Sequence, residues 1–445
     1  MDKYRYDNYH DFIVQLYMDE TANLGPNEAL IRNVTFQVTD DCPLKCSYCY
    51  QGNKGHRMMS KETAKKAVDL LFRMYDEDNS TFINRKTKGI ILEFIGGEEL
   101  MNVEVMDFIC GYFIDQCVEK HHPWLLTSRF SMISNGVLYF NPDFQAFMEK
   151  YKDFTSFGIT LDGDKEIHDR CRVFPDGKGS FDMAVAAEEH YVSHFGGHEG
   201  RDTKVTIAPE NLKDVNRIIK FFVEKGKKII HANTVYEAEW SIEQAKVFYA
   251  ELKKMADYLL ERNDPELMVT LFDERMFRPL DKDNLQCWCG GAGKMLAFDP
   301  DGIAYPCIRY MPSSLGNNAP PVIIGDVNGI YQTEKQKKTK KLLESIDRRT
   351  KNTDECFNCP IADGCADCEA WNYQSSGGKF NVKSMNICNM HKARSLANVY
   401  YWNKLYAKNG ESKRFEMHLP KEDALQYISE EEYAMLQKIS KRAEE

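Results

Sequence analysis

The sequence predicts an α/β protein, with a parallel sheet built from six strand–helix units and a second domain rich in cysteine. Two observations indicate this fold class. Across residues 31–262, short apolar segments alternate with segments whose apolar residues recur at helical spacing, which is typical of a parallel sheet with right-handed crossovers. From Cys287 onward the alternation stops, and cysteines gather in loop-like sequence. We therefore expect one domain over 31–262 and another over 287–390.

Each of the six units pairs one strand with one helix. The first strand covers 31–38, and Ser60 is expected to cap the next helix because Ala64, Val68 and Leu71 after it repeat at helical spacing. The other five units, given as strand and helix, are 90–95 with 103–119, 128–134 with 142–151, 155–161 with 180–193, 203–208 with 212–225, and 228–235 with 242–262.

The remaining segments lie around these two domains. Residues 1–30 are predicted to form an N-terminal extension, 263–286 a bridge and 391–445 a charged helical segment. A lysine-rich stretch at 333–352 is expected to be a solvated helix face.

Composition restricts the class of protein. The formal charge of -10 argues against non-specific nucleic-acid binding as the main task, so no nucleic-acid partner is expected. The sequence has no apolar run of about 18–20 residues and no secretory signal, which predicts a cytoplasmic protein without a membrane partner. In that compartment, clustered cysteines usually bind metal rather than form disulfides.

Three cysteines follow the first predicted strand at C-x3-C-x2-C spacing, namely Cys42, Cys46 and Cys49. A [4Fe-4S] cluster that only carries electrons takes four cysteines, so a loop of three leaves one iron able to bind a small molecule. A structural zinc loop is the alternative, but zinc loops usually supply four ligands as paired C-x2-C units. With its aromatic Tyr48 before the third cysteine, this loop resembles that of the radical S-adenosylmethionine (radical SAM) superfamily.

The resemblance implies both a fold and a chemistry. It implies a partial (β/α)6 barrel of TIM-like type, with the active site at the carboxyl ends of the strands. It also implies that the open iron chelates the methionyl end of S-adenosylmethionine. Reductive cleavage then gives methionine and a 5′-deoxyadenosyl radical, so Cys42, Cys46 and Cys49 are the expected catalytic cluster ligands and Tyr48 part of the cofactor site.

Gly96, Gly97 and Glu98 end the second predicted strand. Glycines permit close approach of a ligand, and a carboxylate beside them can accept hydrogen bonds from an ammonium group. The segment resembles the GGE motif of the family, which holds the cofactor amine. Glu99 stands where the family often has proline.

Short polar side chains follow the third and fourth strands and suit ribose hydroxyls. By resemblance, ribose contact is assigned to Ser134, Thr160 and Asp162, and Arg172 is assigned to the cofactor carboxylate because guanidinium groups bind carboxylates at two points. Asn211 could contact the ribose or adenine, or cap its own helix.

The cysteines of the second domain resemble those of the SPASM domain, an extension of radical SAM enzymes that modify peptides. The resemblance implies two auxiliary [4Fe-4S] clusters, three clusters in total. It assigns one auxiliary cluster to Cys289, Cys307 and Cys368, with either Cys287 or an open iron completing it. It assigns the other to Cys356, Cys359, Cys365 and Cys388. Two zinc sites are the alternative.

The subfamily implies a function for the whole chain. It implies an oxidoreductase that abstracts hydrogen from a ribosomally made, cysteine-containing precursor peptide and joins thiol to carbon in a thioether, as in sactipeptide or ranthipeptide maturation. A flavodoxin or ferredoxin is the expected electron donor. Because 41 residues precede Cys42, we expect no N-terminal leader-binding domain. The rival is an anaerobic sulfatase maturase that forms formylglycine, for which Asp273 and Glu274 are candidate bases.

Overall fold

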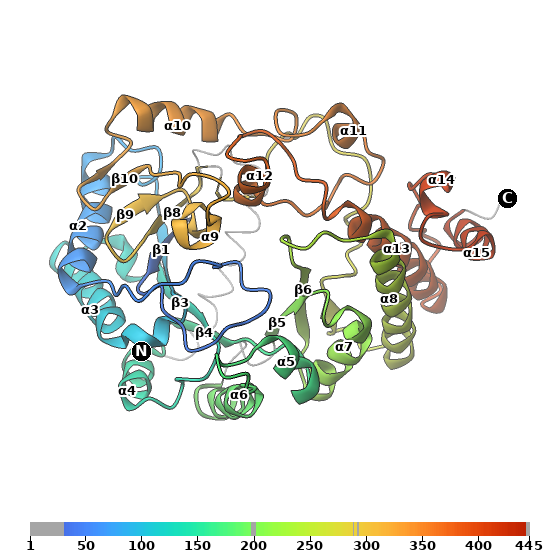
Figure 1. The fold of residues 1–445 in the computed structure, drawn as a ribbon, viewed down its shortest axis with the longest axis horizontal. Helices are drawn as coiled ribbons and strands as arrows, with labels where there is room; N and C mark the ends of the chain where they lie inside the picture. The colour runs from blue at the N-terminus through green and yellow to red at the C-terminus, as the bar shows by residue number, and fades with distance from the viewer. Residues whose placement is uncertain (1–30, 197–201, 288, 292, 442–445) are drawn as a thin grey trace.

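The computed structural model describes residues 31–196, 202–287, 289–291 and 293–441. Six strands form an incomplete ring with helices outside it, and the cysteine-rich region lies against one end of the ring (Figure 1). The predicted N-terminal extension, 1–30, falls outside the described residues.

The six predicted strands are all present, close to their predicted bounds. They are β1 (Ile31–Gln37), β2 (Gly89–Ile95), β3 (Ser128–Ser134), β4 (Thr155–Ile159), β5 (Asp202–Ile207) and β6 (Ile229–Thr234). The helices that follow them are α2 (Lys61–Glu77), α3 (Val103–Glu119), α4 (Pro142–Tyr151), α6 (Phe181–Phe195), α7 (Val215–Glu224) and α8 (Ile242–Arg262).

The helices begin where short polar side chains can cap them. Ser60 accepts a hydrogen bond from the Thr63 amide at the start of α2, and Ser241 forms a capping box with Gln244 at the start of α8. The short helix α5 (Lys165–Cys171) was not predicted, although Asp164 caps it in the same manner.

Strand pairing divides the ring into two sheets. Strands β1 to β4 pair in parallel in sequence order, whereas β5 pairs with β6 and β6 with the short strand β7 (Met268–Val269). In the described residues no ladder joins β4 to β5, so the ring is open there. The predicted bridge, 263–286, thus contributes a strand that the sequence analysis missed.

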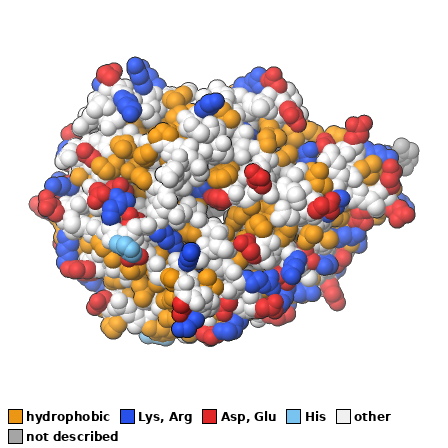
Figure 2. Space-filling model, viewed as in Figure 1, with side chains coloured by type: hydrophobic (Ala, Val, Ile, Leu, Met, Phe, Trp, Pro, Cys, Tyr) orange, Lys and Arg blue, Asp and Glu red, His pale blue; other side chains and the backbone are white. Residues whose placement is uncertain are grey.

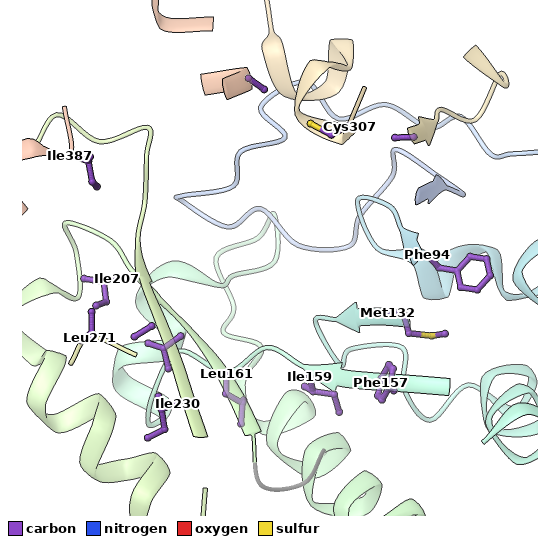
Figure 3. Close-up of a cluster of buried hydrophobic side chains, with 14 of the residues drawn as sticks. Phe94, Met132, Phe157, Ile159, Leu161, Ile207, Ile230, Leu271, Cys307 and Ile387 are labelled. Carbon is purple, nitrogen blue, oxygen red and sulfur yellow. The ribbon is translucent and has the colours of Figure 1, made fainter. Parts of the chain in front are cut away.

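Alternate residues of the ring strands pack against the outer helices. Phe36, Phe94, Met132 and Phe157 belong to one buried hydrophobic cluster, part of which is drawn in Figure 3. Because strand side chains alternate, the residues between them face the interior of the ring. That interior and the carboxyl ends of the strands are where the candidate site lies.

The cysteine-rich region continues the first sheet. Its strand β8 (Met295–Phe298) pairs in parallel with β1 and antiparallel with β9 (Ile303–Tyr305). The remaining elements are the strands β10 (Gly325–Asp326) and β11 (Gly329–Ile330), with the helices α9 (Pro312–Leu315), α10 (Glu334–Glu344), α11 (Asp354–Phe357), α12 (Glu369–Ser375), α13 (Cys388–Lys408), α14 (Lys421–Ala424) and α15 (Glu430–Ser440).

The C-terminal helices lie on the side of the molecule that contains α8. Helix α13 begins at Cys388 and runs across the predicted boundary at residue 390, packing along α8. On the face drawn in Figure 2, acidic and basic side chains are interspersed rather than gathered into a patch of one sign. None of the helices in the described ranges is long and apolar enough to cross a membrane.

Candidate cofactor and cluster sites

The three-cysteine loop lies against the end of β2 through backbone contacts. The Gly97 amide donates to the Thr39 carbonyl at 3.1 Å, and the Glu98 amide donates to the Asp41 carbonyl at 2.8 Å. A Cβ atom on Gly97 would overlap the Asp41 carbonyl and lie 2.8 Å from Cβ of Cys42. The second glycine of the motif is therefore required by the close approach of this loop.

The segment after α5 holds the other side of the loop. Amides of Lys45 and Ser47 donate to the carbonyls of Val173 and Cys171 at 2.7 and 2.9 Å. Burial raises the pKa of the Cys42 thiol to about 11, partly offset by the Lys54 ammonium, and raises that of Cys46, partly offset by Arg172. Because iron binds thiolates, loading this loop is expected to release protons.

The fourteen cysteines are free thiols, which is compatible with metal binding. No three Cys, His, Asp or Glu side chains within the described ranges are already arranged around a single metal ion. In a cubane cluster each thiolate binds a different iron atom. The ligands of a cluster are therefore spaced more widely than the ligands of a single metal ion.

Glu98 lies buried beside the loop, with both carboxylate oxygens bound. Ser134 donates to Oε1 at 2.5 Å, and the Asn135 amide donates to Oε2 at 3.0 Å. Burial raises the pKa of Glu98, whereas these two donors and the Arg172 charge lower it. Ser134 also accepts from the Gly136 amide at 2.9 Å, so its hydroxyl orients Glu98 as well as standing where ribose contact was predicted.

The half-buried Tyr48 and the buried Asp162 and Arg172 form one group on the other side of the loop. The Tyr48 hydroxyl donates to Asp162 and accepts from Nη1 of Arg172 at 3.0 Å. Burial raises the pKa of Asp162, opposed first by the charge of Arg172. Nε of Arg172 is buried with no hydrogen-bond partner among the described residues, so it remains available to a carboxylate. These donors and acceptors fit the methionyl end of S-adenosylmethionine.

The structure brings together some of the other predicted residues. Thr160 follows β4, and its amide donates to the Ser134 carbonyl at 3.0 Å, which places the two side by side. The side-chain amide of Asn211 makes two hydrogen bonds within its own turn. Its oxygen accepts from the Ala208 amide, and its nitrogen donates to the Thr206 carbonyl. The Asn211 side chain makes no capping hydrogen bond to the helix that follows, so these contacts hold the preceding turn and leave both predicted roles untested.

The first cysteine group of the second domain lies around one glycine. A Cβ atom on Gly291 would lie 3.3 Å from Sγ of Cys307 and 3.4 Å from Sγ of Cys289. Cys368 influences the pKa of both thiols, each of which is raised mainly by burial. The three thiols assigned to one auxiliary cluster are thus close together.

Cys287 contacts a buried ion-pair network, part of which also acts on Cys289 and Cys368. Its Sγ lies 3.6 Å from the Ile346 carbonyl, and burial raises its pKa to about 11, offset most by the Lys351 ammonium. Lys351 is itself buried and pairs with Asp367 and, at 2.8 Å, with Glu369. The Cys287 thiol thus contacts a buried ion-pair network.

The other four cysteines also form one neighbourhood. Burial raises the pKa of Cys388 to about 11, and Cys356, Cys359 and Cys365 each contribute to that shift. The Lys383 ammonium lies 3.5 Å from Sγ of Cys365 and can offset the charge of a thiolate ligand there. The predicted second set is therefore gathered between α11, α12 and the start of α13.

Two residues that the sequence analysis missed join the barrel to the cysteine-rich region. The Arg309 guanidinium stacks over the Tyr50 ring, with Cζ 4.7 Å from the ring centroid, and pairs with Glu237. Tyr50 lies next to Cys49 in sequence, and Arg309 follows Cys307, so adjacency to the cysteines was the signal that could have identified them.

The two candidate bases of the bridge are engaged elsewhere. Asp273 pairs with Arg275 at 3.1 Å, and Glu274 pairs with Lys413 at 3.0 Å. Burial raises the pKa of both carboxyls, but Arg275 at Asp273, and Tyr406 with Lys413 at Glu274, bring each below its usual value. Such ion-paired carboxylates are weak proton acceptors.

No family model matches the chain. Among curated proteins, it is 27% identical over 201 residues to an uncharacterised protein of Methanocaldococcus jannaschii, an alignment that spans 45% of the chain and 61% of that protein. It is 28% identical to AlbA, a subtilosin biosynthesis protein of Bacillus subtilis, over 84% of the chain and 75% of AlbA. A cysteine-type anaerobic sulfatase-maturating enzyme of Clostridium novyi is 22% identical over 62% of the chain and 72% of that enzyme.

Solved structures share the fold. The structure of anSMEcpe with bound AdoMet and the Cp18Cys peptide superposes with a TM-score of 0.59 at 18% identity, covering 85% of this chain and 99% of that one. SuiB of Streptococcus suis bound to its precursor peptide SuiA has a TM-score of 0.50 at 13% identity, covering 80% and 76%. The motifs, the fold and these relatives agree: the chain is similar to radical SAM enzymes, and its cysteine-rich C-terminal region fits the SPASM domain.

Proposed function

We propose that the chain is a peptide maturase that joins a cysteine thiol to a carbon atom of a ribosomally made precursor peptide. The observation that carries this proposal is the three-cysteine loop, held by backbone hydrogen bonds against a buried, doubly bound Glu98. When bound, the cluster and S-adenosylmethionine supply a 5′-deoxyadenosyl radical, which can remove hydrogen from an unactivated carbon.

Within this proposal, the residues around the loop bind and orient S-adenosylmethionine. Cys42, Cys46 and Cys49 hold the cluster, and Glu98 accepts hydrogen bonds from the cofactor amine. Arg172 uses its free Nε for the cofactor carboxylate, while Tyr48 and Asp162 keep the guanidinium in place.

Other polar groups are assigned to the rest of the cofactor. Gly96 and Gly97 leave room for the loop and the ligand. The ribose is assigned to Ser134, Thr160 and Asp162. A flavodoxin or ferredoxin would supply the electron.

The second domain is proposed to hold two auxiliary [4Fe-4S] clusters. Cys356, Cys359, Cys365 and Cys388 complete one of them. Cys289, Cys307 and Cys368 hold the other, and the contacts of Cys287 with Ile346 and the Lys351 network favour an open iron there rather than a fourth ligand from Cys287. An open iron could bind the thiolate of the substrate.

A second function has specific support. The Clostridium novyi relative is a sulfatase-maturating enzyme, and the anSMEcpe structure contains a cysteine peptide, which favours formylglycine formation on a cysteine. Against it, the two candidate bases of the bridge are both ion-paired. AlbA, which takes part in subtilosin biosynthesis, supports the peptide maturase.

Mass spectrometry distinguishes the two functions. The reconstituted full-length enzyme is incubated with S-adenosylmethionine and dithionite, together with Cp18Cys or with cysteine-containing peptides encoded beside its gene. The thioether proposal predicts a product that loses two hydrogens, keeps its sulfur and resists both thiol alkylation and reductants. An aldehyde on Cp18Cys, without a crosslink on any neighbouring peptide, would favour formylglycine formation instead.

A further inference from the structure

The interior of the ring contains a carboxylate that the proposed cofactor site does not use. Glu93 lies in the middle of β2, between Leu92 and Phe94, whose side chains are fully buried against the outer helices. Figure 3 shows Phe94 in that hydrophobic cluster. Because strand side chains alternate, Glu93 points to the opposite side, into the ring.

Several side chains on the inner face of the ring are exposed. Ile133 occupies an inward position of β3 and is 53% exposed, although it lies within a central strand. Inward positions of β5 and β6, among them Lys204 and His231, are exposed as well and lie opposite each other in the strand register. These side chains face space rather than packed protein.

Glu93 has one bound oxygen and one free oxygen. Thr35 donates to Oε2 at 2.6 Å, and no hydrogen bond to Oε1 is found within the described ranges. Three charged or titratable groups outside β2 interact electrostatically with this carboxyl. They are Lys204 of β5, Tyr50 of the cysteine loop and Glu99 after β2.

The balance of these groups favours a proton acceptor. Burial raises the pKa of Glu93, while the Thr35 hydrogen bond and the Lys204 charge lower it. A carboxyl poised nearer to neutral pH accepts protons more effectively than an exposed one. The Glu93 charge also raises the pKa of Tyr50, which is adjacent to Cys49 and stacked under Arg309, so the carboxyl acts electrostatically on the cofactor loop.

We propose that Glu93 accepts the proton that the reacting thiol of the substrate loses. This inference rests on the proposed function. The S–H bond of the substrate breaks as its proton moves to Glu93, either when the thiol binds or after hydrogen-atom transfer from the substrate carbon to the 5′-deoxyadenosyl radical, and the carbon–sulfur bond then forms. One proton and one electron must leave, the proton to the Glu93 carboxylate and the electron to an iron-sulfur cluster of the second domain. Formylglycine chemistry on cysteine releases the same proton and electron.

The test separates radical generation from product formation. Glu93→Gln is compared with wild type, using whichever peptide the wild-type enzyme converts. We expect product to fall by about 10²–10⁴-fold, the usual contribution of a general base, while 5′-deoxyadenosine formation stays within about threefold. The variant therefore makes 5′-deoxyadenosine without making product.

The pH profile adds a readout that a purely structural role would not change. A base acts only when deprotonated, so the wild-type rate falls as pH drops through the pKa of Glu93. Thr35→Val removes a hydrogen bond that lowers this pKa, so the acid limb should move to higher pH. Lys204→Met removes a charge that lowers it and should shift the limb in the same direction.

A matched control and a peptide-free measurement complete the design. Glu251→Gln makes the same substitution at a buried glutamate of α8, which is paired with Lys254 away from the ring interior. In infrared titration of the peptide-free holoenzyme, Glu93→Gln should remove a carboxylic acid band that titrates above the usual range for glutamate, and Glu251→Gln should keep it.

Several results would overturn the inference. They are equal losses of 5′-deoxyadenosine and product in Glu93→Gln, an unmoved acid limb in Thr35→Val, and no missing band in the infrared titration. If no peptide is converted by wild type, the proposed function fails by itself. The infrared titration then still decides whether Glu93 is poised to take up a proton.

Discussion

The hydroxyl of Ser134 is expected to control cofactor affinity through Glu98. Ser134→Ala removes the donor at 2.5 Å from Oε1 and leaves that buried oxygen without its partner, although the Asn135 amide still binds Oε2. A hydrogen bond to a charged group contributes about 1.5–3 kcal/mol. Because each 1.4 kcal/mol is a factor of ten, we expect S-adenosylmethionine to bind about ten- to a hundredfold more weakly.

The same substitution should make binding depend more strongly on pH. The Ser134 hydrogen bond lowers the pKa of Glu98, so its loss raises a pKa that burial has already raised. Only the ionised carboxylate attracts the cofactor amine. The variant therefore needs a higher pH to reach full affinity. Between pH 6.5 and 8.5 its Kd should decrease by a larger factor than the Kd of wild type.

Isothermal titration of the reconstituted full chain with S-adenosylmethionine measures both effects. Ser128→Ala is the matched control, because Ser128 is a buried serine at the opposite end of the same strand. An affinity in Ser134→Ala equal to that of the control at every pH would refute the role assigned to this hydrogen bond.

Three further substitutions test other parts of the site. Gly97→Ala should displace the cysteine loop and so lower both the iron content and the Tm. Gly52→Ala is the control and should change neither, because no atom lies within 4 Å of the added carbon. Equal iron content in the two variants would contradict the packing argument. Arg172→Ala should weaken cofactor binding about ten- to a hundredfold in the same titration, and unchanged Kd would remove it from the site. Cys287→Ala should keep the iron content of wild type, and loss of iron would make Cys287 a ligand.

Local sequence patterns predicted most of the barrel. Helix 142–151 and helix 242–262 were predicted with the bounds that the structure has. In the structure Asn141 and Ser241 cap these helices, which are local signals of the kind that a sequence carries. What local patterns do not encode is pairing between distant strands. The open ring between β4 and β5 and the parallel pairing of β8 with β1 depend on tertiary packing.

The candidate site, like the fold, was predicted only in part from the sequence. Motif spacing predicted which side chains would meet, and Glu98, Ser134 and Arg172 do lie around the cysteine loop. Spacing could not predict that Ser134 binds Glu98, because that contact depends on how two neighbouring strands end. Glu93 was also missed, since one charged residue within an apolar strand carries no motif, and its inward orientation follows only from the structure.

The most direct test of the central claim is reductive cleavage of S-adenosylmethionine by the reconstituted full-length protein. With dithionite and no peptide, the wild-type enzyme should produce 5′-deoxyadenosine. The variant in which Cys42, Cys46 and Cys49 are all replaced by alanine should produce none, while the second domain keeps its iron. Continued formation of 5′-deoxyadenosine by the triple variant would contradict the assignment of this loop as the catalytic cluster site.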